Sequence, residues 1–260
     1  MCTVTWISSA DGYTVFCNRD EMRTRALAIP PALHLHQGMR CIFPIDPNSG
    51  GSWIGANEHG LTACLLNGDE SRCDATRLFS SRGTLLTAVI ASRTPMIALY
   101  RLAGQRLSDF RPFRLALFAP AKPVLLVSWD GRALDTTIST AEQPLTSSTI
   151  EPELVQRQRR ERYLRLIAAG MHDDAEAHLA YHADHGDGAG AHTVCMHRPD
   201  AQTVSFSRVR VTAASVDFLY LPGPPCRTRS RTSVLLARPV AAAGQPALVS
   251  LVPPRSFDQS

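Results

Sequence analysis

Cys2 is the residue near the start of the chain whose chemistry stands out most clearly. If Met1 is removed, Cys2 carries both a thiol and a free α-amine, and these two groups form a nucleophile and a base within one residue. The α-amine has a reference pKa of about 7.7 to 8.0, so a neutral fraction exists near pH 7. This pairing predicts a nucleophile that attacks an acyl carbon.

A polar cluster, Asn18-Arg19-Asp20-Glu21, follows a short distance along the chain. A fixed cation such as Arg19 favours the thiolate form of a nearby cysteine, and Asp20 is suited to accept a hydrogen bond from an α-amine and orient it. The same four residues are equally typical of a solvated strand end. If they continue a strand, alternation sends Arg19 and Asp20 to opposite faces.

Asn67 is a candidate donor for a developing oxyanion, because side-chain amides often stabilise such charges in acyl transfer. It directly follows the apolar segment LTACLL and opens the turn Asn67-Gly68-Asp69. The alternative is that Asn67 only supplies turn geometry, as an Asn-Gly pair commonly does.

Histidines 172, 178, 182, 185, 192 and 197 suggest a metal site, since His178 and His182 would share one face of a helix. No glutamate lies within that HxxxH stretch, and the flanking Asp and Gly residues are typical of a loop. We therefore expect solvated surface histidines, with no metal and no cofactor. The seven cysteines contain no CxxC pair, which favours reduced thiols in a cytoplasmic protein over a zinc ribbon or a disulfide framework.

The elements that must position Cys2 begin with a predicted β-hairpin. Strands over 3–8 and 13–17 flank the turn at Asp11-Gly12, and this hairpin would bring residues 18–21 beside Cys2. Further strands are expected at 41–43, 52–56, 61–66, 113–119, 123–129, 192–197, 202–209 and 218–221, and helices at 81–93, 148–169 and 173–183, the second capped by Ser148. Strand runs separated by blocks of helices predict an α+β layered fold with mostly antiparallel sheets.

Composition narrows the function classes. Of 260 residues, 44% are apolar and 19% are charged, which excludes a highly charged disordered chain. The net charge of +4 comes without a basic stripe interleaved with aromatic residues, so we expect no nucleic-acid partner. No run of about 18 apolar residues and no signal peptide is present, so we expect no integral membrane segment. Composition shifts after Leu221, which predicts one domain over 1–222 and a mobile Pro/Arg/Ala-rich tail over 223–260.

Several segments in order carry a family resemblance. MCT at the start, NRDE at 18–21, GGSWIGANEHGLTACLLN at 50–67, LTSS at 145–148 and HTVCMHRPDAQTVSF at 192–206 resemble the NRDE family, also called the transport and Golgi organisation 2 family. The resemblance covers most of residues 1 to 221.

That family is similar in turn to the cysteine N-terminal-nucleophile hydrolases, such as bile salt hydrolases and penicillin V acylases. The resemblance implies a four-layer αββα sandwich with Cys2 as nucleophile and with Arg19 and Asp20 as its neighbours. It also implies Asn67 as an oxyanion or substrate donor. Ser147 falls where the hydrolases carry an asparagine, and His192 where related chains carry an arginine. The substrate-binding side chains expected on this basis are Asn18, Glu21, Ser147 and His192.

Two functions are compatible with these residues. The first is hydrolysis of a linear amide C–N bond by Cys2 after Met1 removal, with a small-molecule acyl amide as substrate. The alternative is a non-catalytic binding or trafficking protein for haem or acyl lipids on the same scaffold, since fold does not determine function. Assembly into a homo-oligomer is compatible with either.

Overall fold

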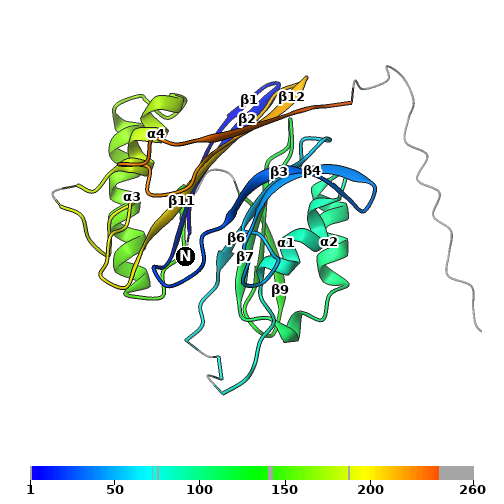
Figure 1. Cartoon of the computed structure of the whole chain (residues 1–260), viewed down its shortest axis with the longest axis horizontal. Coiled ribbons are helices and arrows are strands. Elements are labelled where there is room, and N and C mark those ends of the chain that lie inside the picture. Colours follow the sequence, from blue (N-terminus) through cyan, green and yellow to red (C-terminus); the bar gives the residue numbers. More distant parts are fainter. Residues whose placement is uncertain (1, 72, 75, 140–142, 187, 240–260) are drawn as a thin grey trace, which may run out of the picture.

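Two antiparallel β-sheets stack face to face, and a pair of helices covers the outer face of each (Figure 1). The structure is a computed structural model that describes residues 2–71, 73–74, 76–139, 143–186 and 188–239. All the strand pairs within the two sheets are antiparallel across these ranges. The predicted αββα sandwich is therefore confirmed.

The first sheet has six strands in the order β10-β1-β2-β11-β12-β13, and the second has seven strands, β3 to β9, in chain order. The first comprises β1 (Cys2–Ser9), β2 (Gly12–Met22), β10 (Leu145–Thr146), β11 (Ala201–Val211), β12 (Ser215–Leu221) and β13 (Thr232–Ala237). The second comprises β3 (Ile29–His36), β4 (Met39–Ile45), β5 (Ile54–Asn57), β6 (Thr62–Asn67), β7 (Phe113–Phe118), β8 (Val124–Trp129) and β9 (Leu134–Ser139). The helices are α1 (Gly83–Ile90), α2 (Pro95–Ala103), the short 3-10 helix η1 (Leu107–Asp109), α3 (Pro152–Ala168) and α4 (Ala175–Ala183).

The N-terminal hairpin forms as predicted. Ser9 pairs with Gly12, so a two-residue loop joins β1 to β2, and the ladder continues to the pair formed by Cys2 and Arg19. Gly12 is required there because a Cβ atom would lie 2.0 Å from the carbonyl oxygen of Val211 on the neighbouring β11. The hairpin thus places residues 18–21 at the same end of the sheet as Cys2.

Alternation along β1 and β2 divides their side chains between two layers. Cys2, Val4 and Trp6 face the core between the sheets, together with Val15 and Cys17 of β2. Burying each large apolar side chain of this kind contributes about 1.5–3 kcal/mol. The intervening polar residues face the helix layer, so one face of the hairpin builds the core and the other must find polar partners.

His178 and His182 of α4 supply part of that polar layer. The hydroxyl of Thr5 lies 2.8 Å from Nδ1 of His178 and 2.9 Å from Nε2 of His182, and both histidines are fully buried. Phe16 stacks on the His178 ring. The expectation that these two histidines are solvated is therefore wrong, because the helix turns the HxxxH face inward onto the sheet.

The helix over residues 148–169 begins later than predicted. Its first residue is Pro152, a favourable N1 residue because its missing N–H would have no helical partner. Ser148 is not the cap: Glu151 holds that position, and the Ser148 hydroxyl donates to the carbonyl of Ile150. The buried stripe of α3 consists of Val155, Arg159, Tyr163 and Leu166.

The region after residue 190 departs from the sequence expectations in two ways. Residues 192–197 form no named strand; they run as a loop with one isolated bridge between His197 and Gln202. The expected domain boundary at residue 222 falls inside the first sheet, because β13 pairs with β12 along its whole length. Residues 240–260 of the expected tail lie outside the described residues. None of the described helices is both long and apolar enough to cross a membrane.

Candidate active site

The main chain of Cys2 is fixed on both sides by Ser147. The Cys2 nitrogen donates to the Ser147 hydroxyl at 3.0 Å, and the Ser147 nitrogen donates to the Cys2 carbonyl at 3.0 Å. Ser147 directly follows β10, whose pairing with β1 brings it there. Ser147 therefore contacts the atom that would become the α-amine.

The thiol of Cys2 is enclosed. Cys2 is only 5% exposed and lies among the side chains of the core between the sheets. Two causes hold the pKa of the Cys2 thiol well above its usual value: the larger is a side-chain hydrogen bond with Cys17, and the second is burial. The thiol is therefore protonated at neutral pH, and a thiolate forms only if a base removes its proton.

Arg19 is the cross-strand partner of Cys2, so the two side chains share a face of the sheet. Its guanidinium lies 4.1 Å from the ring centre of Trp53, which gives a cation–π contact. Its Nη2 atom is 2.8 Å from Oδ2 of Asp46 and 3.7 Å from Oε2 of Glu21. Asp46 also binds Arg25 at 2.6 Å. The positive charge beside Cys2 is thus held in place and partly balanced.

Asp20 points to the other face, toward α3. It accepts a hydrogen bond from Thr203 at 2.6 Å and forms an ion pair with Nη1 of Arg159 at 3.2 Å. Both charged side chains are buried, at 0% and 1% exposure. Arg159 also donates to the hydroxyl of Thr3, the neighbour of Cys2. Asp20 therefore supports the start of β1 from the helix side.

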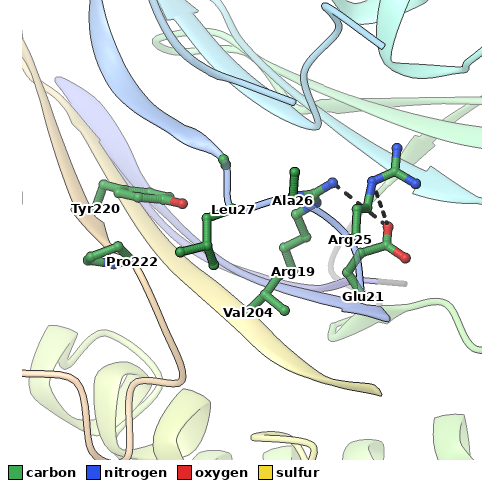
Figure 2. A pocket seen from close by; sticks show the side chains of 9 residues that line it. Arg19, Glu21, Arg25, Ala26, Leu27, Val204, Tyr220 and Pro222 are labelled. Carbon is green, nitrogen blue, oxygen red and sulfur yellow. Dashed lines mark ion pairs between the residues drawn. The ribbon is translucent and has the colours of Figure 1, made fainter. Parts of the chain in front are cut away.

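A small hollow opens next to Arg19 (Figure 2). Its volume is about 20 Å³, which is room for about one water molecule. Figure 2 shows the guanidinium groups of Arg19 and Arg25 both directed at the carboxylate of Glu21, with Leu27 and Tyr220 lining the hollow farther along. Residues 25–28 line this hollow, and Leu27 among them is 79% exposed. A wider hollow of about 660 Å³ lies at the opposite end of the hairpin, and none of the predicted site residues lines it.

The remaining predicted residues have separate surroundings. The Asn18 amide donates to the carbonyls of His182 and Val194, at 2.9 and 3.0 Å, on the helix side of the sheet. His192 pairs with Glu151 at 2.8 Å near the surface. Asn67 ends β6 opposite Phe113, and alternation groups it with the residues that face α1 and not with those that face Cys2. The structure thus brings Cys2, Arg19, Glu21 and Ser147 together, with Asp20 behind them.

The family model described as Transport and Golgi organisation 2 matches residues 1–172 of the 260. The chain belongs to the Transport and Golgi organisation 2 family. A comparison with curated proteins found no match.

Three solved structures have a fold similar to that of this family member. A variant of the conjugated bile acid hydrolase from Clostridium perfringens has a TM-score of 0.56 at 10% identity, covering 90% of this chain and 92% of that one. The N-acylethanolamine-hydrolyzing acid amidase ortholog from Caenorhabditis elegans has a TM-score of 0.56 at 12% identity, covering 80% and 92%. Penicillin V acylase from Agrobacterium tumefaciens has a TM-score of 0.50 at 11% identity, covering 85% and 83%. At these identities the likeness shows the N-terminal-nucleophile hydrolase fold alone.

Sequence reasoning missed several residues of this Transport and Golgi organisation 2 protein's site. Arg159 lies in the run QRQRRERYLR, which is typical of a solvated helix face. The spacing in the sequence could have indicated that Arg159 is buried, because it lies four residues from both Val155 and Tyr163 and so falls in the apolar stripe of the helix. Cys17 had a signal, because alternation in the predicted hairpin places it on the same face as Arg19, the cross-strand partner of Cys2. Asp46 gave no signal, because its contact with Arg19 depends on how the two sheets pack.

Proposed function

We propose that this protein hydrolyses a linear amide C–N bond with Cys2 as an N-terminal nucleophile. The observation that carries the proposal is the contact between the Cys2 nitrogen and the Ser147 hydroxyl at 3.0 Å, which would orient the α-amine after removal of Met1. The hydrolase-like scaffold and the cation of Arg19 directly across the ladder support it.

The proposed reaction has two halves. The neutral α-amine takes the proton of the Cys2 thiol, and the sulfur forms a bond to the carbonyl carbon of the amide. The resulting ammonium gives that proton to the leaving nitrogen, so the C–N bond breaks, an amine departs and a thioester remains. Water then attacks the thioester with the α-amine as base, which releases the carboxylic acid and restores the thiol. The raised pKa of the Cys2 thiol is the reason that a base within the same residue is needed.

Arg19 and its surroundings have a different part in this proposal. The guanidinium is fixed by Trp53 and Asp46, so it reaches the developing negative charge without first having to be ordered. Glu21 and Arg25 line the small hollow beside it and would contact the substrate there. Asn67 stays a prediction as an oxyanion or substrate donor and His192 as a substrate contact, since Asn67 is grouped with the residues that face α1 and His192 pairs with Glu151.

The test combines mass spectrometry with a substrate panel. Intact mass decides whether Met1 is absent, and release of amine from a panel of acyl amides is compared among wild type, Cys2→Ser and the matched control Cys73→Ser. We expect Cys73→Ser to retain turnover and Cys2→Ser to lose it. Activity should rise with pH up to about 8, as the α-amine becomes neutral. Equal background rates for wild type and Cys2→Ser would refute the proposal.

A second candidate function is the binding of haem or an acyl lipid without catalysis. The observation that favours it is the enclosed, protonated thiol of Cys2. Titration with haem and with acyl-CoA separates the two candidates, because a binding protein would give saturable binding that survives Cys2→Ser. Absence of saturable binding to either ligand would remove this candidate. We place either function in the cytoplasm, since all seven cysteines are free thiols.

A further inference from the structure

Four donor atoms converge outside the candidate active site. They belong to His185, Cys195, His197 and Cys226, and all lie within 4.8 Å of one another. Nε2 of His197 is 3.2 Å from Nε2 of His185, 3.6 Å from the sulfur of Cys195 and 3.4 Å from the sulfur of Cys226. Two imidazoles and two thiols therefore surround one point.

We propose that these four side chains bind a structural zinc ion. Zinc bonds of about 2.0–2.1 Å to nitrogen and about 2.3 Å to sulfur, arranged as a tetrahedron, place neighbouring ligand atoms roughly 3.3–3.8 Å apart. The three separations of His197 from the other donors match this range closely. Two thiolates also balance the charge of a divalent cation, so a partly buried site would be neutral overall. With four protein ligands no position remains for water or substrate, which indicates a structural role.

Three separate segments supply the ligands. His185 follows the end of α4, Cys195 and His197 lie in the loop that precedes β11, and Cys226 lies in the connection from β12 to β13. Backbone hydrogen bonds already align the first two segments: the Cys195 nitrogen donates to Asp184 at 3.0 Å, and the His197 nitrogen donates to Gly190 at 3.0 Å. A metal would join the helix layer to the end of the first sheet, where the described chain between α4 and β11 has no regular structure of its own.

The proposed zinc site is also connected to Asp20. Met196, between two of the ligands, donates its backbone N–H to the Thr203 hydroxyl at 2.8 Å, and that hydroxyl donates to Asp20 at 2.6 Å. The ion would hold the loop that supports this carboxylate. The sequence expectation of no metal covered six histidines, His185 and His197 among them, and it was argued from the spacing of His178 and His182, which contact Thr5. The proposal does not depend on the activity of Cys2.

The test uses the untagged full-length chain, because an affinity tag of histidines would bind metal itself. We expect about one zinc per chain by elemental analysis after dialysis against a weak chelator, with two sulfur and two nitrogen neighbours by X-ray absorption. Cobalt substitution should give the visible absorption of a tetrahedral ion and thiolate charge-transfer bands. These wild-type measurements decide the question even if a ligand variant fails to fold.

Variants then locate the ion. Cys195→Ser and Cys226→Ser should each lose the bound metal, whereas Cys73→Ser should keep it. Cys2→Ser should also keep it, and this control is needed because an N-terminal cysteine is itself a chelator. The proposal is overturned if reduced wild-type protein takes up no zinc or cobalt, if the metal survives both ligand substitutions, or if Cys195 and Cys226 form a disulfide in protein purified under reducing conditions.

Discussion

The buried ion pair between Arg159 and Asp20 gives the sharpest test of how the helix layer supports Cys2. The change is Arg159→Leu, which fits the apolar stripe of α3 but removes the guanidinium that pairs with the Asp20 carboxylate, itself at 0% exposure. At a separation of 3.2 Å and an effective dielectric constant of about 20, the lost attraction is about 5 kcal/mol. Removing one partner of a buried pair typically costs about 3–5 kcal/mol. We therefore expect the free energy of unfolding to fall by about 3–5 kcal/mol.

Urea unfolding followed by circular dichroism measures this change, with Arg160→Leu as the matched control. Arg160 is the next residue of the same helix and is exposed, so its replacement should cost within about 0.5 kcal/mol of zero. The double variant with Asp20→Asn should recover part of the loss, because the buried negative charge that faced Arg159 is then removed. If Arg159→Leu costs no more than Arg160→Leu, or if Asp20→Asn gives no relief, the assignment of Arg159 as the support of Asp20 is wrong.

Three further predictions concern other parts of the molecule. Ser147→Ala removes the hydroxyl that accepts a hydrogen bond from the Cys2 nitrogen. We expect kcat/KM for amide hydrolysis to fall by the equivalent of about 1–3 kcal/mol. An unchanged kcat/KM would show that Ser147 has no part in the reaction. Burial holds the pKa of His182 well below its usual value, so the unfolded chain binds this proton more readily. The contribution of His182 to stability should be full above pH 6.5 and fall below it by at most about 1.4 kcal/mol per pH unit, so the slope of stability against pH should be smaller in His182→Gln than in wild type. Gly51→Ala would place a Cβ 2.4 Å from the carbonyl carbon of Gly83 and should destabilise by about 1–3 kcal/mol in urea unfolding, whereas Gly104→Ala, with its nearest atom at 3.6 Å, should not.

Local patterns were sufficient for the hairpin and for the orientation of its polar residues. The turn at Asp11-Gly12 and the strand alternation predicted that Cys2 would meet residues 18–21, and that Arg19 and Asp20 would face opposite ways. The structure confirms both, because Arg19 contacts Trp53 on one side and Asp20 contacts Arg159 on the other. These features depend on neighbours within about twenty residues along the chain.

Long-range pairing accounts for what the sequence did not predict. The i, i+4 spacing of His178 and His182 defines a face but not its direction, and only packing against Thr5 buries it. Cys226 belongs to a segment whose composition is typical of a mobile tail, yet the chain reversal between β12 and β13 places its sulfur 3.4 Å from His197. A donor set drawn from three loops has no fixed spacing in sequence, so no motif could have indicated it.

The contact of the Cys2 nitrogen with Ser147 also bears on when Met1 is removed. Closure of β1 between β2 and β10 leaves Cys2 only 5% exposed, so we expect removal of Met1, which the proposed mechanism requires, to take place before this closure. Ser147 lies 145 residues farther along the chain than Cys2. At a synthesis rate of about 5–20 residues per second, the ribosome takes roughly 7–29 s to reach Ser147 after it has made Cys2. An aminopeptidase can act on Met1 during this interval. The yield of mature protein would then depend on competition between removal of Met1 and closure of β1 between its two neighbouring strands.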